Sequence, residues 1–148
     1  MSGKKRAYKH RLESLLAGKG GGAVRELGRW HERILAGLEF KAVDKLKAHA
    51  ALTDSELARL LGISEATLRR SRAAGSALDA ATSDRLYRLS KILAVAEEVL
   101  ADAPAAMTWL RRAQPGLAGH VPLDLLVTQA GADEVETLLR RIDYGVYT

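Results

Sequence analysis

Cysteine is absent from the 148 residues of the sequence. This absence excludes a disulfide scaffold, a thiolate zinc site and a cysteine nucleophile, and it suits a reducing compartment. No apolar run approaches the length of about 18 residues that a transmembrane helix needs. The basic N-terminus is not followed by the apolar stretch of a secretory signal. We therefore expect a cytoplasmic protein.

Residues that favour β-structure or interrupt helices are also scarce. There is one phenylalanine and there are three prolines, whereas alanine and leucine are abundant. No stretch alternates apolar and polar residues as a half-buried strand would. Hydrophobic residues make up 47% of the chain, enough to build a core. The composition predicts an all-α fold.

Motifs that carry catalytic chemistry are missing as well. The four histidines share no metal-ligand spacing: His10, His31, His49 and His120. The glycine run at residues 18–22 lacks both the Lys-Ser/Thr ending and the preceding strand of a phosphate-binding loop. We expect no catalytic residue, no metal and no cofactor, and the protein is not predicted to be an enzyme.

Charge is distributed unevenly along the chain, whose formal net charge is +5. Residues 1–47 hold 12 Lys and Arg against 5 Asp and Glu, whereas residues 92–148 hold 4 against 8. A basic N-terminal part and an acidic C-terminal part suggest two different partners. Composition alone leaves two interpretations of the basic part open: it contacts nucleic acid, or it is a solvated tail.

Apolar spacing predicts a succession of helices. A short helix at residues 8–17 has Leu12, Leu15 and Leu16 on one face and precedes the glycine run, which we interpret as a flexible joint. Ser83 is expected to open a strong helix that ends near Leu100.

Three shorter helices are predicted near the C-terminus. Pro104 and Pro122 fit first helical positions, and the helix after Pro104 is expected over residues 105–113. Gly131 is expected to end the helix that Pro122 begins. A last helix is expected over residues 133–142, with its apolar residues facing inward.

The most specific motif is a helix-turn-helix signature at residues 53–70. Thr53 and Glu56 have the spacing of a capping box, and Gly62 permits the left-handed backbone of a tight turn between helices. Ala58 allows the second helix to cross closely, and Leu68 is expected to point into the core. The same corner also occurs in helical bundles and protein-binding scaffolds, so the motif does not by itself establish DNA binding.

The second helix of this motif has the features of a DNA recognition helix. Its N-terminal turns are expected to enter the major groove, while its arginines reach guanines or phosphates. The candidate DNA-binding residues are Ser64, Glu65, Ala66, Thr67, Arg69, Arg70 and Arg72.

Longer stretches carry a family resemblance. Residues 56–64, 67–70 and 83–89 resemble the helix-turn-helix domain of Xre-type antitoxins. The toxin-binding domain of Xre/MbcA/ParS antitoxins is resembled by residues 117–126 and 139–147, together with Trp109, Leu110, Gly131 and Val135. Ala118-Gly119 stands where the family usually has Gly-Gly. The resemblance implies an Xre-like helix-turn-helix domain followed by a small helical toxin-binding domain.

The resemblance also implies partners. Antitoxins of this family, in RES–Xre type II toxin–antitoxin systems, bind and silence RES-domain toxins that act on NAD, and the complex represses its own promoter, usually with the antitoxin as a dimer. The resemblance implies that the C-terminal tail inserts into or beside the toxin's active site. The residues alone, without the resemblance, favour a tail that folds back on its own helices or is frayed. The candidate toxin-binding residues are Arg140, Arg141, Tyr144, Gly145, Val146, Tyr147 and Thr148.

We therefore expect three segments: a basic, partly flexible arm (1–22), a helix-turn-helix domain for DNA binding and dimerisation (23–100) and a toxin-binding domain (101–148). The predicted function is an antitoxin that neutralises a RES-domain toxin and binds operator DNA. Two alternatives stay open. One is a solitary transcriptional regulator whose C-terminal part only mediates dimerisation. The other is an antitoxin that has lost DNA affinity.

Overall fold

The computed structural model describes residues 11–16 and 29–145, and every regular element in these ranges is helical. The all-α prediction is therefore confirmed. Residues 11–16 are helical, and the labelled elements after them are α2 (Arg29–Ala36), α3 (Lys41–Ala50), α4 (Asp54–Leu61), α5 (Glu65–Ala74), α6 (Ala80–Leu100), α7 (Ala103–Leu110), the short 3₁₀ helix η1 (Pro115–Leu117), α8 (Pro122–Leu125) and α9 (Gln129–Asp143).

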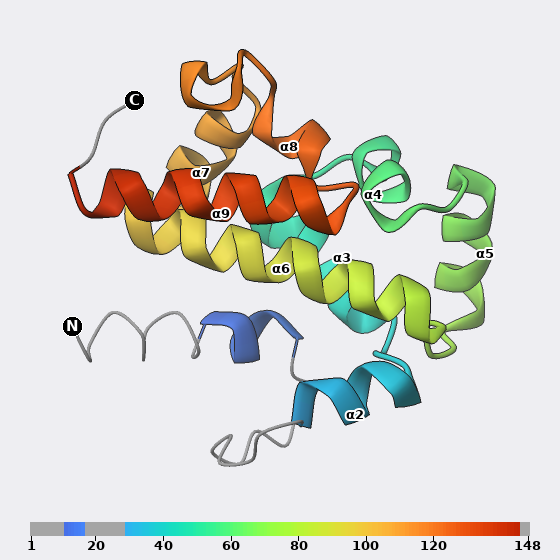
Figure 1. The fold of residues 1–148 in the computed structure, drawn as a ribbon. Coiled ribbons are helices and arrows are strands. Elements are labelled where there is room, and N and C mark those ends of the chain that lie inside the picture. Colours follow the sequence, from blue (N-terminus) through green and yellow to red (C-terminus); the bar gives the residue numbers. More distant parts are fainter. Residues whose placement is uncertain (1–10, 17–28, 146–148) are drawn as a thin grey trace.

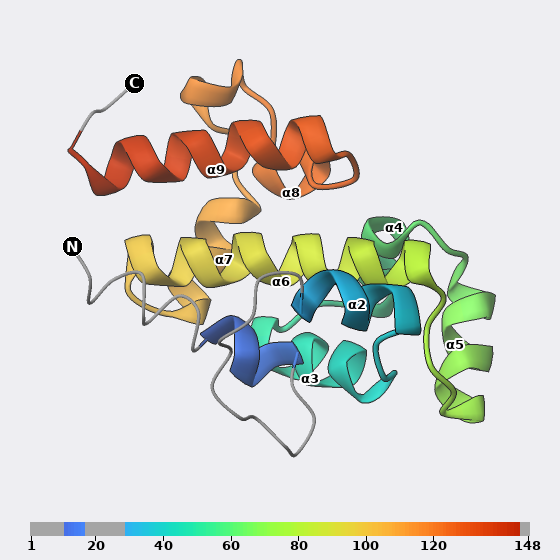
Figure 2. The same cartoon turned by 60° about the horizontal axis from the view of Figure 1, so that its bottom comes forward.

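Helix α6 runs through the centre of the molecule. It lies between α9 on one side and α2, α3 and residues 11–16 on the other (Figure 1 and Figure 2). Its C-terminal half is buried around most of its circumference, including Ala94, Val95 and Ala96. A helix buried in this way connects the two layers that pack against it.

Helix α6 begins earlier than the sequence suggested. Asp79 caps it, because its side chain accepts a 2.7 Å hydrogen bond from the backbone N–H of Thr82. The first turn of α6 therefore precedes Ser83. Ser83 is buried, and its hydroxyl oxygen accepts a hydrogen bond from the backbone N–H of Leu38. Ser83 joins this helix to the segment before α3 and does not start it.

One continuous core fills the described part of the chain. It extends from Leu12, Leu15 and Leu16 in the N-terminal helical segment to Leu139 in α9. The predicted apolar face of the first helix is confirmed for residues 11–16. The rest of the basic arm, including the glycine run, lies outside the described residues.

The C-terminal helices follow the predicted order with two corrections. Pro104 occupies the first turn of α7, as expected, but α7 ends at Leu110 and not at the predicted Ala113. Asp102 caps α7 by accepting the backbone N–H of Ala105. The prediction that Gly131 ends a helix is wrong. Thr128 caps α9 by accepting the Gly131 N–H, so Gly131 lies in the first turn of that helix.

Close packing explains the glycine at position 131. A Cβ atom there would stand 2.0 Å from the carbonyl oxygen of Leu125, at the end of α8. Since carbon and oxygen cannot approach that closely, only glycine permits this corner between α8 and α9. Sequence patterns do not distinguish such a contact from a helix stop.

None of the described helices combines the length and apolar character that crossing a membrane requires.

Candidate functional site

The corner between α4 and α5 is built as the helix-turn-helix signature predicts. Thr53 accepts the backbone N–H of Glu56 at 3.1 Å, and the Glu56 carboxylate accepts the N–H of Thr53 at 3.0 Å, which confirms the capping box. Gly62 has a φ of 69° and lies in the left-handed region. The N–H of Ile63 then donates to the carbonyl of Ala58, so the chain turns directly into α5.

Helix α5 presents nearly all of its surface to solvent, because Leu68 is its single buried residue. Ser64 caps the helix by accepting the backbone N–H of Thr67. The hydroxyl of Thr67 accepts hydrogen bonds from Ser64 Oγ at 2.9 Å and from Arg70 Nη2 at 3.2 Å. These bonds orient Arg70 toward the N-terminal turn of the helix, where a recognition helix contacts bases.

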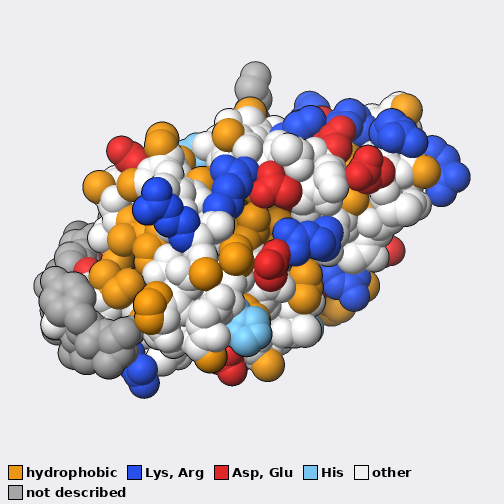
Figure 3. Space-filling model, turned by 90° about the horizontal axis from the view of Figure 1, so that it is seen from above, with side chains coloured by type: hydrophobic (Ala, Val, Ile, Leu, Met, Phe, Trp, Pro, Cys, Tyr) orange, Lys and Arg blue, Asp and Glu red, His pale blue; other side chains and the backbone are white. Residues whose placement is uncertain are grey.

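Cationic side chains gather at the end of the molecule occupied by α5 (Figure 3). Arg69 and Arg70 are exposed there, next to the exposed Glu65 and Ala66. Among the described carboxylates, none forms an ion pair with Arg69 or Arg70. These two guanidinium groups can therefore meet an external anion.

Arg72, grouped with them on sequence grounds, is placed differently. Its guanidinium bonds both oxygens of Asp54, at 2.9 and 3.2 Å, and one oxygen of Asp44, at 3.0 Å. Hydrogen bonds from Arg72 and Lys47 hold the pKa of the Asp54 carboxyl well below its ordinary value. The Arg72 charge is thus balanced within the protein.

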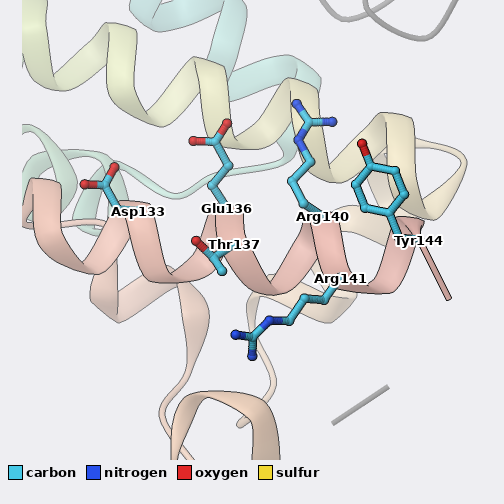
Figure 4. Close-up of a pocket in the computed structure, with 6 residues that line it drawn as sticks. All are labelled: Asp133, Glu136, Thr137, Arg140, Arg141 and Tyr144. Carbon is cyan, nitrogen blue, oxygen red and sulfur yellow. The ribbon is translucent and has the colours of Figure 1, made fainter. Parts of the chain in front are cut away.

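A second candidate surface lies on α9. Asp133, Glu136, Thr137, Arg140 and Tyr144 form a stripe along one side of the helix, which we call the α9 stripe. With Arg141 they line a shallow hollow of about 470 Å³. In Figure 4 Arg140 and Tyr144 project on the same side of the helix, whereas Arg141 projects on the other.

The α9 stripe ends in an exposed aromatic side chain, since Tyr144 is 68% exposed. An aromatic that is so accessible at the end of a helix is available to a partner. Gly145 follows it with a φ of 76°, in the left-handed region that favours glycine. The candidate residues Val146, Tyr147 and Thr148 lie outside the described residues.

Polar contacts join the helix-turn-helix to the C-terminal helices α7 and α8. Arg111, at the end of α7, bonds the Glu56 carboxylate at 3.0 and 3.2 Å and the carbonyl of Ala51 at 2.9 Å. Arg59 of α4 forms an ion pair with Asp124 of α8. Sequence reasoning missed these links, because pairs separated by 55 and 65 residues leave no local pattern.

The Arg111 contact affects the capping box itself. Partial burial opposes ionisation of Glu56, but hydrogen bonds from Arg111 and from the Thr53 backbone outweigh it and lower the pKa of this carboxyl. Glu56 is therefore ionised, and its carboxylate accepts hydrogen bonds from Arg111 while it also accepts the Thr53 N–H of the capping box.

Replacing Arg111 with Ala is expected to lower the free energy of unfolding by about 1 kcal/mol, since the pair with Glu56 is partly exposed. Urea unfolding measures this change. Arg112→Ala, at an exposed neighbouring position, is the matched control and should cost less than about 0.5 kcal/mol. Equal losses in both variants would show that the Glu56 contact contributes nothing.

No cluster of His, Cys, Asp or Glu that could hold a metal ion occurs among the residues that the structure describes. The two surfaces differ in character. Helix α5 carries the exposed Arg69 and Arg70, and α9 carries a stripe of mixed charge that ends in the exposed Tyr144.

Comparisons with known proteins agree with this two-part organisation. Residues 29–91 match the family model of the antitoxin Xre-like helix-turn-helix domain. Residues 95–145 match that of the antitoxin Xre/MbcA/ParS C-terminal toxin-binding domain. The fold and both matched regions define an antitoxin with a helix-turn-helix domain and a toxin-binding domain.

Similar proteins identify the family. An antitoxin Xre of Pseudomonas putida KT2440 is 31% identical over 141 residues, which cover 93% of this chain and 84% of the relative. An antitoxin Xre of Yersinia enterocolitica is 28% identical over 118 residues, or 79% of this chain and 80% of the relative. The chain belongs to the Xre antitoxin family.

Proposed function

We propose that this antitoxin neutralises a RES-domain toxin acting on NAD and represses its own operon by binding promoter DNA. The observation that supports both activities is the separation of the two surfaces. Helix α5 and the Tyr144 end of α9 lie at opposite ends of the molecule (Figure 1). A toxin on one end leaves the other end accessible to DNA.

On the DNA side, the first turns of α5 contact base edges through Ser64, Glu65, Ala66 and Thr67. Arg69 and Arg70 reach phosphates or guanines. A homodimer places two such helices on a palindromic operator, as two-fold symmetric repressors do. The family resemblance and the exposure of these side chains support this assignment.

Replacing Arg69 and Arg70 together with Ala is expected to weaken promoter binding at least tenfold. Each lost phosphate contact lowers the slope of log K against log salt concentration by about 1. Titrations of a fluorescent promoter duplex at several salt concentrations measure both quantities. Promoter activity in cells that this double replacement leaves unchanged would favour the alternative of an antitoxin that has lost DNA affinity.

On the toxin side, the proposed contacts are the end of α9 and the residues that follow it: Arg140, Arg141, Tyr144, Gly145, Val146, Tyr147 and Thr148. Tyr144 supplies a rigid amphipathic ring, and the arginines can pair with acidic toxin side chains. The proposed role of the tail is to enter or cover the site where the toxin binds its substrate.

The decisive experiment is co-purification with the product of the neighbouring reading frame, followed by an NAD depletion assay. We expect a stable complex that stops NAD depletion. Deletion of residues 144–148 should allow the toxin to deplete NAD again. Promoter binding by the truncated protein serves as the folding control. If no complex forms and this protein alone shifts its promoter, the solitary regulator is the correct function.

A further inference from the structure

The guanidinium of Arg72 joins three helices. It extends from α5, bonds both carboxylate oxygens of Asp54 at the start of α4, and bonds Asp44 in α3. Its central carbon also lies 5.7 Å from the centre of the Phe40 ring. A planar guanidinium held by three hydrogen bonds and an aromatic face has a fixed position.

The charges around Arg72 cancel. Lys47 pairs with Asp54 at 2.8 Å, so two cations and two carboxylates form one cluster. Arg72 therefore adds no net charge to the face that would meet DNA. If the same N–H groups were to bind a phosphate, Arg72 would have to give up its charge-assisted hydrogen bonds to Asp54 and Asp44.

Helix α5 needs such an attachment. Leu68 is its single buried residue, and a short exposed helix has little stability of its own. Arg72 follows Leu68 by one helical turn and fixes the far part of α5 against α3 and α4. The angle of a recognition helix decides which of its side chains reach the bases.

We propose that Arg72 is a positioning residue, which sets the orientation of α5 through Asp54 and Asp44 and does not itself contact DNA. This assignment rests on the proposed DNA-binding function. It differs from the expectation that Arg72 neutralises phosphate alongside Arg69 and Arg70.

The full-length variant Arg72→Lys tests the proposal, because it keeps the charge and loses the planar fork. We expect its affinity for a duplex of its own promoter region to fall at least tenfold. Affinity for an unrelated duplex of equal length should stay within twofold. The slope of log K against log salt concentration should stay unchanged for both duplexes. A phosphate-contacting Arg72 predicts the opposite: Arg72→Lys near wild type, and Arg72→Ala with a slope smaller by about 1.

Asp54→Asn provides an independent variant. Removing a negative charge near a phosphate contact would strengthen DNA binding. A positioning role predicts weaker promoter binding, as for Arg72→Lys. Stronger binding by Asp54→Asn would overturn the proposal.

Hydrogen exchange of the α5 amides gives a readout that needs no DNA. Arg72→Lys and Asp54→Asn should accelerate exchange in residues 68–74, whereas Arg70→Lys, at an exposed position, should not. Unchanged exchange in both would overturn the proposal. The wild-type protein could fail to prefer its promoter while Arg72→Lys still accelerates exchange in α5. That result would overturn the proposed DNA-binding function and would leave Arg72 with a purely structural role.

Discussion

Replacing Leu68 with Ala is expected to abolish specific promoter binding and to leave toxin binding intact. Leu68 is fully buried and is the one residue that anchors α5 in the core. Truncating a buried leucine costs about 2–5 kcal/mol, through lost transfer free energy and the cavity that remains. Because α5 has no second buried apolar residue, the loss of stability falls first on α5 itself.

Two measurements check this separation of functions. Anisotropy titration with promoter DNA should show a loss of at least a hundredfold, while co-purification with the toxin continues. Leu139→Ala, a fully buried leucine of α9, is the matched control and should weaken the toxin complex more than DNA binding. If Leu68→Ala retained wild-type promoter affinity, α5 could not be the helix that reads DNA.

Replacing Gly131 with Ala should produce the complementary defect. Helix propensity alone favours alanine over glycine by about 1 kcal/mol, so an ordinary helical site would become more stable. Here the added Cβ would meet the Leu125 carbonyl oxygen at 2.0 Å and its carbon at 2.8 Å. Backbone atoms cannot rotate away as a flexible side chain would, so α8 and α9 must separate.

We expect Gly131→Ala to lower the free energy of unfolding by about 3 kcal/mol and to abolish stable toxin binding. Urea unfolding and co-purification measure these effects. The neighbouring Ala130 is exposed, and Ala130→Gly should cost only the propensity difference of about 1 kcal/mol. A stabilised Gly131→Ala protein would show that the corner between α8 and α9 opens freely.

Local features of the fold followed from the sequence where neighbouring residues determine them. The capping box of Thr53 and Glu56, the left-handed turn at Gly62 and the inward position of Leu68 each depend on a few consecutive residues. Spacing of apolar residues likewise located the N-terminal helical segment and α6. Caps, turns and apolar faces can be predicted in this way, because local propensity and helical periodicity depend on nearby residues.

Features set by distant contacts were not predictable. Gly131 resembles a helix stop, because its real constraint is the backbone of another helix. Asp79 caps the start of α6, but the apolar spacing that indicated this helix begins only after Ser83. The sequence therefore placed the start of the helix too late. Propensity describes a segment in isolation, whereas the folded protein places it against a specific neighbour.

The candidate surfaces divide in the same way. Exposure of Arg69, Arg70 and Tyr144 agrees with a role in binding, and helical spacing could indicate it. The contacts of Arg72 with Asp44 and of Arg111 with Glu56 could not be found from spacing, since their partners lie 28 and 55 residues away. A positive charge in a sequence therefore does not reveal whether it is available to DNA.

The central helix α6 limits how the binding specificities of such antitoxins can be exchanged. The helix-turn-helix match ends at residue 91 and the toxin-binding match begins at residue 95, both inside α6. A hybrid joined between these residues would keep an unbroken helix but combine side chains selected for two different sets of neighbours. Successful recombination of toxin and operator specificity in this family therefore requires α6 to be redesigned together with the helices that pack on it.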